Sequence, residues 1–218
     1  MATTLIIPAA GTGSRFGGMV PKQFVLIQNQ PIIIRTLKAF EHIKEIDNII
    51  ISLNKDWLTH CKDLVRSFNI KSKVEFVAGG DERQDSVFYA LQKTQMLRSD
   101  IILIHDAVRP YPSKNLIERV IEETKKFDAV IPGIIPKDTI KSVDEEEFVK
   151  ETINRNFLRS IQTPQGFKKE LLIQSYQKAM DDNFYSTDDS ALVEHSGHKV
   201  KIIEGEITNI KITTTEDL

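Results

Sequence analysis

The sequence predicts an α/β fold in which helices cover both faces of a largely parallel sheet. Short runs rich in Ile and Val are typical of strands that are buried on both faces, and they occupy residues 4–9, 49–53, 74–77, 101–105 and 129–135. Between these runs, apolar residues recur at helical spacing in residues 31–43, 56–68, 85–97 and 113–126. Strands that alternate with helices are joined by right-handed crossovers, which makes neighbouring strands parallel.

The composition is that of one ordinary domain without a strongly charged surface. The chain has 218 residues, 40% of them hydrophobic, so we expect residues 1–218 to form a single domain. The formal net charge of −2 provides no basic field that would favour nucleic acid or an anionic membrane. Met1 is not followed by a charged leader, a long apolar segment or a cleavage pattern, and the single Cys61 cannot form an internal disulfide. We therefore expect a cytoplasmic protein.

A glycine-rich loop follows the first predicted strand, where ligands of parallel sheets usually bind. Gly11, Gly13 and Gly17 lack the Cβ that would keep an anion away from backbone N–H groups. Arg15 and Lys22 add two positive charges. A glycine-rich surface turn is the alternative interpretation, but two cations directly after a buried strand favour a site for a triphosphate.

Two known phosphate loops do not match this segment. The P-loop requires Gly-Lys-Ser/Thr, whereas Lys22 lies between Pro21 and Gln23. The dinucleotide fingerprint requires a glycine at its sixth position, where this chain has Phe16. The loop therefore disfavours an NAD-linked dehydrogenase.

The loop of residues 78–87 also follows a predicted strand and opens with two glycines. Asp81 can cap the next helix, and Ser86 lies in the first turns of that helix. A capping turn alone would explain Gly80 and Asp81, so a structural and a ligand-binding role both stay open for this loop.

A third loop, residues 104–110, places Asp106 at the end of a central strand. A carboxylate beside a triphosphate is compatible with a divalent cation, which binds oxygen ligands and neutralises the charge. An Asp that caps the next turn is the structural alternative. His105 lies within the strand pattern, and we interpret it as a hydrogen-bonded core residue rather than a base.

Residues 138–153 alternate apolar and polar side chains around an acidic turn, which predicts an antiparallel hairpin. An isolated two-stranded ribbon is marginal in water, so we expect this arm to form a dimer contact by exchange between two subunits. The acidic side chains of residues 144–147 are expected to be solvated.

The C-terminal part predicts one helix start and one further strand. Thr187 is the expected cap of a helix in which Asp188 and Asp189 favour the helix dipole, so we interpret both acids as structural. Residues 209–213 predict a short strand in which Lys211 is the single cation. An edge-strand surface lysine is the ordinary interpretation of Lys211.

Segments in this order resemble the sugar- and polyol-phosphate nucleotidyltransferases, and among them the cytidylyltransferases that act on 2-C-methyl-D-erythritol 4-phosphate. The matching segments are residues 9–15 (Ala-Ala-Gly-x-Gly-x-Arg), 21–24 (Pro-Lys-Gln-Phe), 79–87 (Gly-Gly-x-x-Arg-x-x-Ser-Val), 105–110 (His-Asp-Ala-Val-Arg-Pro), 163–165 (Thr-Pro-Gln) and 209–213 (Asn-Ile-Lys-Ile-Thr). The resemblance implies a Rossmann-like nucleotidyltransferase three-layer sandwich with a mostly parallel mixed sheet. It also implies a protruding β-hairpin dimerisation arm at about residues 138–155 and a homodimer.

The resemblance further implies that CMP is transferred from CTP to 2-C-methyl-D-erythritol 4-phosphate in non-mevalonate isoprenoid synthesis. Pyrophosphate would leave, 4-diphosphocytidyl-2-C-methyl-D-erythritol would form, and Mg²⁺ or another divalent cation would assist. A cytidylyltransferase for ribitol 5-phosphate or another polyol phosphate is an alternative, because it shares the Pro-Lys-Gln-Phe and His-Asp-Ala-Val-Arg-Pro strings. Thr187-Asp188-Asp189-Ser190 and Arg83-x-x-Ser86-Val87 look more like the methylerythritol enzyme. A non-catalytic nucleotide-binding regulatory module is an alternative of another class, since a fold does not determine a function.

The family's functional residues can be placed on this chain one by one. Those implied as catalytic are Arg15, Lys22, Arg155 and Lys211. Those implied as CTP-binding are Pro8, Ala9, Ala10, Gly11, Thr12, Gly13, Lys22, Gly80, Asp81, Arg83 and Ser86. Those implied as substrate-binding are Asp106, Arg109, Thr139, Arg155, Thr163 and Lys211, with Asp106 also the metal ligand.

Overall fold

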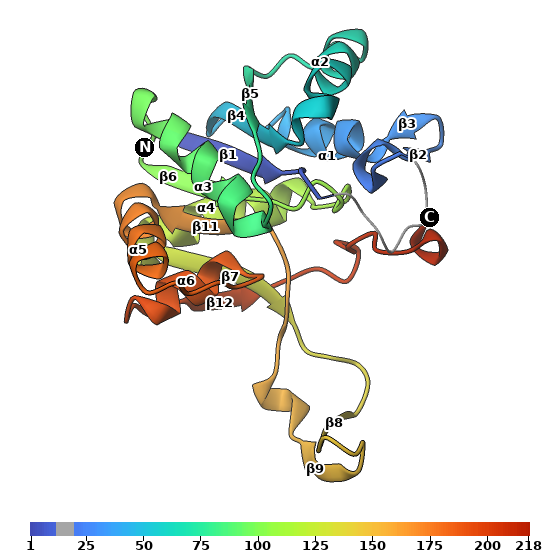
Figure 1. The fold of residues 1–218 in the computed structure, drawn as a ribbon, viewed down its shortest axis with the longest axis vertical. Coiled ribbons are helices and arrows are strands. Elements are labelled where there is room, and N and C mark those ends of the chain that lie inside the picture. Colours follow the sequence, from blue (N-terminus) through green and yellow to red (C-terminus); the bar gives the residue numbers. More distant parts are fainter. Residues whose placement is uncertain (12–19) are drawn as a thin grey trace.

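A mixed sheet forms the centre of the molecule, with helices on both of its faces (Figure 1). The computed structural model describes residues 1–11 and 20–218. The strands run in the order β10-β7-β11-β6-β1-β4-β5, and β12 pairs with β7. The strands of this sheet are β1 Thr3–Pro8, β4 Ile46–Leu53, β5 Val74–Ala78, β6 Ile101–Ile104, β7 Ala129–Ile134, β10 Ser160–Ile161, β11 Gln165–Lys168 and β12 Lys201–Glu204. The helices are α1 Ile32–Phe40, α2 Leu58–Ser67, α3 Arg83–Lys93, α4 Lys114–Phe127, α5 Lys169–Asp181 and α6 Asp189–His195.

The predicted α/β order is confirmed for the first two-thirds of the chain. Strand β1 pairs in parallel with β4 and β6, and β4 pairs in parallel with β5. Strand β11 is inserted antiparallel between β6 and β7, which makes the sheet mixed. Gly166 allows this insertion, because a Cβ at this position would collide with Thr124 of helix α4.

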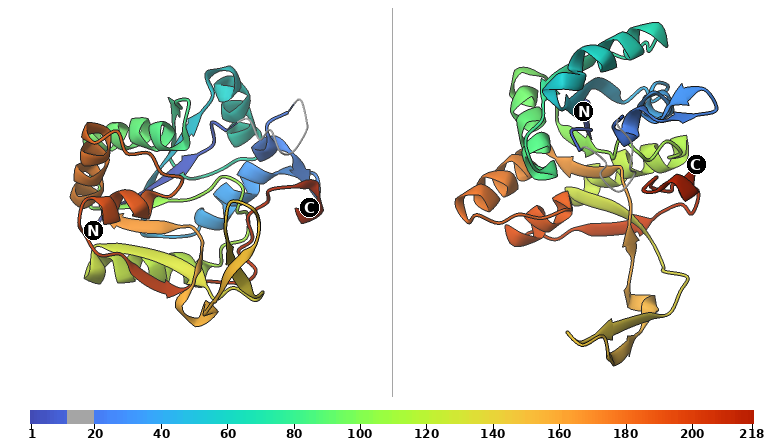
Figure 2. Two further views of the ribbon diagram at one scale, coloured as in Figure 1. Left: turned by 60° about the horizontal axis from the view of Figure 1, so that its bottom comes forward. Right: turned by 45° about the vertical axis from the view of Figure 1, so that its right-hand side comes forward.

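Two hydrophobic cores lie on opposite faces of the sheet because successive strand residues point to opposite sides. In β1, Leu5 and Ile7 pack with α1, α2 and α4, whereas Ile6 packs with α3, α5 and α6. Cys61 on α2 belongs to the first core, and burial raises the pKa of its thiol to about 12. The helices on both faces are visible in Figure 2. Each fully buried Ile or Leu contributes about 1.5–3 kcal/mol, so this double core fixes the strand ends that carry the loops.

The hairpin projects from the body of the molecule, as predicted (Figures 1 and 2). It consists of β8 Ile140–Val143 and β9 Val149–Ile153, which pair antiparallel with each other and with no other strand of residues 1–11 and 20–218. Asp144 closes its turn by accepting hydrogen bonds from the backbone N–H groups of Glu146 and Phe148. A second, smaller ribbon is formed by β2 Leu26–Ile27 and β3 Gln30–Pro31.

Three local predictions are wrong. Residues 209–213 form no strand, because the buried Asn209 is held by side-chain contacts instead of a ladder: its amide donates to the Thr163 carbonyl and its own carbonyl accepts from Arg109. Helix α6 begins after Asp188 rather than Thr187. Helix α3 begins after Glu82 rather than Asp81, since Asp85 accepts a hydrogen bond from the Glu82 N–H as in a capping box.

Within residues 1–11 and 20–218, no helix has both the length and the apolar run that crossing a lipid bilayer requires.

Candidate active site

A cleft of about 360 Å³ opens beyond the carboxyl ends of β1 and β6. Loops that are distant in sequence meet there, as expected for a parallel sheet. The predicted site residues that line it are Pro8, Ala9, Ala10, Gly11, Lys22, Gly80, Asp81, Arg83, Ser86, Asp106 and Lys211. Thr12, Gly13 and Arg15 lie outside the described residues. The structure thus brings the two lysines and the turn into α3 into one space.

The loop after β1 is held by Gln23, which the sequence analysis did not select. Its side-chain amide donates to the carbonyls of Ala9 (2.6 Å) and Gly11 (3.3 Å), and the residue is buried. Lys22 precedes it in the short 3₁₀ helix Lys22–Phe24 and reaches the cleft. The Pro-Lys-Gln-Phe string contains this glutamine, but the sequence gives no indication of the partners of its amide.

The turn into α3 approaches the β1 loop closely. A Cβ on Gly79 would lie 2.5 Å from the Cβ of Ala10 and 2.8 Å from the Ser86 hydroxyl oxygen, so this position requires glycine. The Ser86 hydroxyl accepts from the Gly80 N–H and donates to the Glu82 carbonyl, at 3.1 Å in both cases. Since Glu82 is the helix cap, the Asp81 side chain is not needed to start α3 and lines the cleft instead.

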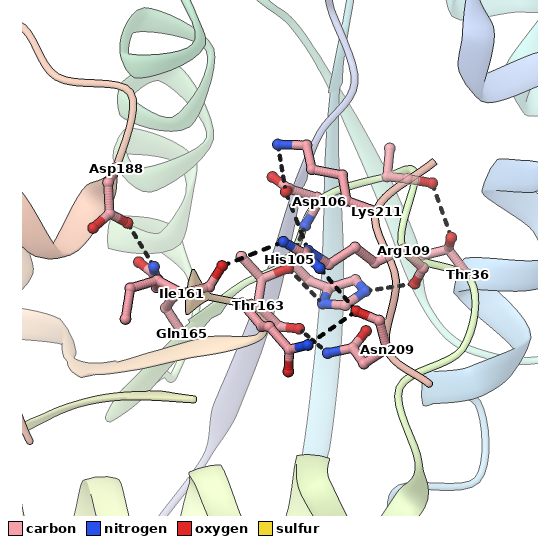
Figure 3. A network of polar contacts seen from close by, with 12 residues as sticks. Thr36, His105, Asp106, Arg109, Ile161, Thr163, Gln165, Asp188, Asn209 and Lys211 are labelled. Atoms are coloured by element: carbon pink, nitrogen blue, oxygen red, sulfur yellow. Dashed lines mark hydrogen bonds and ion pairs between the residues drawn. The ribbon is translucent and has the colours of Figure 1, made fainter. Parts of the chain in front are cut away.

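Asp106 lies on the cleft wall at the centre of a cluster of cations, of which Figure 3 shows Lys211 and Arg109. Its carboxylate is 2.9 Å from the Lys211 ammonium, 3.5 Å from Nε of Arg109 and 3.6 Å from the Arg83 guanidinium. Burial alone would raise the pKa of Asp106, but the charges of Arg83, Lys211 and Arg109 hold this pKa well below its usual range. The carboxylate is therefore ionised at neutral pH.

The buried side chain of Asp189 holds the Arg83 guanidinium in place. The Asp189 carboxylate, only 1% exposed as a residue, lies 2.7 Å from the Arg83 guanidinium and accepts a hydrogen bond from the Tyr176 hydroxyl (2.6 Å). Burial would lower the pKa of Arg83, but Asp189 and Asp106 raise it. Asp189, predicted to be structural, therefore pairs with Arg83. Tyr176 supports this pair through its hydroxyl and was not selected from the sequence.

His105 and Thr163 lie behind the cleft wall. His105 is a hydrogen-bonded core residue, as predicted: its ring nitrogens lie 3.0 Å from the Thr163 hydroxyl and 2.9 Å from the Arg109 carbonyl. Burial lowers the pKa of His105 to about 4, so the ring is neutral at pH 7. The Arg109 guanidinium is also buried and donates to the carbonyl of Asn209.

Thr139 and Arg155 are predicted site residues that lie away from the cleft altogether, whereas Arg109 and Thr163 lie directly behind its wall. Both are exposed and lie at the base of the arm, on either side of the hairpin. The Arg155 guanidinium donates to the carbonyl of Lys137. Within a single chain, therefore, the predicted acceptor residues fall into two separate groups.

The donor set suits a metal that arrives together with a phosphate ligand. In the part of the chain that the structure describes, no three His, Cys, Asp or Glu side chains are grouped to hold an ion by themselves. Asp106 offers one ionised carboxylate, one oxygen of which contacts Lys211. Mg²⁺ is commonly held by one or two carboxylates while phosphates and water complete its octahedron.

Comparison with known proteins gives a consistent result over nearly the whole chain. The family model described as "IspD: 2-C-methyl-D-erythritol 4-phosphate cytidylyltransferase" matches residues 3–218. A Bacillus cereus protein of the same description is 43% identical over 215 residues, which cover 99% of this chain and 94% of the relative. A Clostridium botulinum protein so described is also 43% identical, over 213 residues that cover 98% and 94%.

Solved structures agree with these sequence relatives. The 4-diphosphocytidyl-2C-methyl-D-erythritol synthase of Anaerococcus prevotii superposes with a TM-score of 0.87 at 36% identity, covering 99% of this chain and 94% of that one. The 2-C-methyl-D-erythritol 4-phosphate cytidylyltransferase of Francisella tularensis superposes with a TM-score of 0.82 at 28% identity, covering 100% and 96%. The predicted nucleotidyltransferase fold is thereby confirmed.

Proposed function

The chain belongs to the 2-C-methyl-D-erythritol 4-phosphate cytidylyltransferase family, and we propose which of its residues perform each part of the reaction. It is an enzyme that transfers CMP from CTP to 2-C-methyl-D-erythritol 4-phosphate, releasing pyrophosphate and forming 4-diphosphocytidyl-2-C-methyl-D-erythritol. The observation that carries the proposal is the convergence of Lys22, Lys211 and the glycine turn of α3 on one cleft.

The chemical step joins two anions. A phosphate oxygen of the acceptor attacks the α-phosphorus of CTP, and the bond from that phosphorus to the bridging oxygen breaks as pyrophosphate leaves. The protein must neutralise the repulsion between the partners and the charge that develops on the α-phosphoryl oxygens. Lys22 from the β1 loop supplies one such charge, and Arg15, which lies outside the described residues, stays a predicted second one.

The reaction needs no general base from the protein. A phosphate monoester is largely dianionic at neutral pH and is already a nucleophile. Among the described residues that line the cleft there is no histidine, and the neighbouring His105 is buried with both ring nitrogens hydrogen-bonded. The gain in rate comes from orientation and electrostatics.

The turn into α3 binds the cytosine ring in this proposal. Gly80, Asp81 and Ser86 border the cleft and offer main-chain groups, a carboxylate and a hydroxyl, which can hydrogen-bond to an uncharged base. Arg83 also stabilises the Asp106 carboxylate in addition to lining the CTP site, because its guanidinium lies between the carboxylates of Asp106 and Asp189.

The acceptor site is shared between two subunits in this proposal. Lys211 and Asp106 from one chain hold the acceptor at the cleft, and Arg109 and Thr163 lie behind Asp106. Thr139 and Arg155 are exposed at the base of an arm whose tip carries the exposed Phe148, so they are available to a partner's cleft. A homodimer through the arm would complete the set.

A divalent cation belongs to the proposal as a companion of CTP. Asp106 would be its one protein ligand, and the cation would supply further positive charge at the triphosphate. Turnover should disappear when a chelator removes divalent ions and return when Mg²⁺ is added in excess.

The cytoplasmic location is also part of the proposal, and fractionation of the source cells tests it.

Release of pyrophosphate tests the activity. CTP with 2-C-methyl-D-erythritol 4-phosphate should give pyrophosphate, and CTP with ribitol 5-phosphate should give far less. Preference for ribitol 5-phosphate would instead select the related polyol-phosphate activity. Binding of CTP without pyrophosphate from either acceptor would identify a non-catalytic nucleotide-binding module.

A further inference from the structure

The turn that carries Asp106 is held by two residues that do not line the cleft. The Asp106 N–H donates to the Thr163 hydroxyl oxygen at 3.0 Å. That hydroxyl lies 3.0 Å from Nδ1 of His105, and Nε2 of His105 lies 2.9 Å from the Arg109 carbonyl oxygen. Figure 3 shows this path passing beneath the Asp106 carboxylate and its contact with Lys211.

Donor and acceptor capacities allow one hydrogen arrangement along this path. A carbonyl oxygen can only accept, so Nε2 of His105 carries the hydrogen that reaches Arg109. Nδ1 of the neutral ring is then an acceptor, and Thr163 must donate its only hydroxyl hydrogen to it. The Thr163 oxygen in turn accepts from Asp106. The path therefore has a fixed direction and a fixed imidazole tautomer.

Both ends of the turn are thus connected to the His105 ring, Arg109 directly and Asp106 through the Thr163 hydroxyl. Asp106 and Arg109 contribute backbone groups to this path, while their side chains form an ion pair with each other. His105 and Thr163 are both buried, so water does not replace a lost hydrogen bond readily. The Thr163 hydroxyl donates its only hydrogen to His105, so it has none left to donate to the polyol-phosphate substrate.

We propose that Thr163 and His105 are positioning residues for the transfer reaction: they hold residues 106–109 so that the Asp106 carboxylate meets Lys211 and Arg83 at the cleft wall. This inference rests on the proposed function. Thr163 serves the acceptor through Asp106 rather than by donating a hydrogen bond to it. A misplacement of a catalytic contact by about 1 Å can cost about 10²-fold in rate, so small shifts of this turn matter.

Thr163→Val and Thr163→Ser form a matched pair that separates the hydroxyl from the shape of the side chain. We expect kcat to fall about 10- to 100-fold in Thr163→Val and roughly 3-fold or less in Thr163→Ser, with the KM of both substrates nearly unchanged. Thr4→Val is the control, because the Thr4 hydroxyl is buried and has no hydrogen-bond partner within residues 1–11 and 20–218. This control should keep the kcat of the unmodified chain.

A double-mutant cycle tests whether Thr163 acts through Asp106. In an Asp106→Asn background, Thr163→Val should lower kcat by roughly 2-fold or less, since residues that act as a unit are not additive. A full additional loss in that background, equal kcat for the Val and Ser variants, or a rise in acceptor KM without a change in kcat would each overturn the positioning role. If Thr163→Val does not fold, Thr163→Ala replaces it with the same expectations, because alanine also lacks a donor for Nδ1 of His105.

The imidazole ¹⁵N chemical shifts of His105 report the path without any turnover. The unmodified chain and Thr163→Ser should show the single tautomer with hydrogen on Nε2, and Thr163→Val should show a shifted Nδ1 resonance or a mixture of tautomers. An unchanged Nδ1 resonance in Thr163→Val would overturn the inference by itself. Absence of pyrophosphate from the unmodified chain would instead refute the proposed function.

Discussion

The turn at residues 105–109 and the arm at about residues 138–155 both carry predicted acceptor residues, but they are built in opposite ways. The turn is buried and tied by hydrogen bonds to Thr163, Thr36 and Ile212. The arm is a two-stranded ribbon with exposed apolar side chains, and no third strand joins it within the described part of the chain. One half of the acceptor site is therefore pre-organised within the chain, whereas the other half depends on what the arm contacts.

Asp189→Asn should have the largest effect on the rigid half. It leaves the guanidinium of Arg83 without its nearest carboxylate, and removal of one partner of a buried ion pair costs about 3–5 kcal/mol of unfolding free energy. Chemical denaturation measures this loss. Asp182→Asn is the matched control, because Asp182 pairs with Lys178 and His195 at the surface and its change should alter stability little. Equal stability of the two variants would contradict the importance of the buried pair.

Lys22→Ala should remove most turnover while the fold stays intact. Loss of one charge that stabilises the transition state lowers kcat by about 10²–10³-fold. Pyrophosphate release measures the activity, and circular dichroism with thermal denaturation measures the fold. Lys55→Ala, an exposed lysine outside the cleft, should keep full activity. Near-normal turnover of Lys22→Ala would take this residue out of the chemistry.

Mixing two inactive variants tests the half of the site that comes from the arm. If Lys22 and the partner subunit's Arg155 serve the same cleft, a heterodimer of Lys22→Ala and Arg155→Ala chains contains one intact site. Random exchange of subunits should then restore roughly one quarter of the sites. Verified heterodimers without any recovery would show that the arm does not reach the partner's cleft.

Phe157→Ser should have the smallest effect on a single chain. The Phe157 side chain next to Arg155 is 85% exposed, so its loss should change the unfolding free energy by about 0.5 kcal/mol or less. In sedimentation the same change should weaken the proposed dimer. Met96→Ser, at another exposed apolar residue, should leave the sedimenting mass unchanged. An unaltered mass in Phe157→Ser would place the dimer contact elsewhere.

The sequence predicted the first two-thirds of the fold well because local patterns and tertiary packing agree there. Buried runs such as residues 101–105 are strands wherever they are covered on both faces. Strand β11 was not predicted, since Gln165–Lys168 has neither an apolar run nor an alternating pattern. Its position depends on the contact of Gly166 with helix α4, which no local pattern contains.

In the candidate site, too, some residues could be predicted from local sequence patterns and others depend on tertiary contacts. Residues in the loops that follow strands, such as Asp106 and Gly11, could be selected because the fold class predicts where these loops meet. Tyr176 and Gln23 could not, because their hydrogen bonds join segments that only the folded chain brings together. Arg155 is a different case, because it is exposed in the single chain and its proposed role depends on contacts with a second chain.

Cys61 gives this protein an internal reporter of its own opening. Its thiol is fully buried on α2, and burial raises its pKa to about 12, so almost none of it is the reactive thiolate at neutral pH. Alkylating reagents should therefore label the native chain only during excursions that uncover this helix. Because the chain has a single cysteine, the rate at which mass is gained reports how readily helix α2 is uncovered, without an engineered probe.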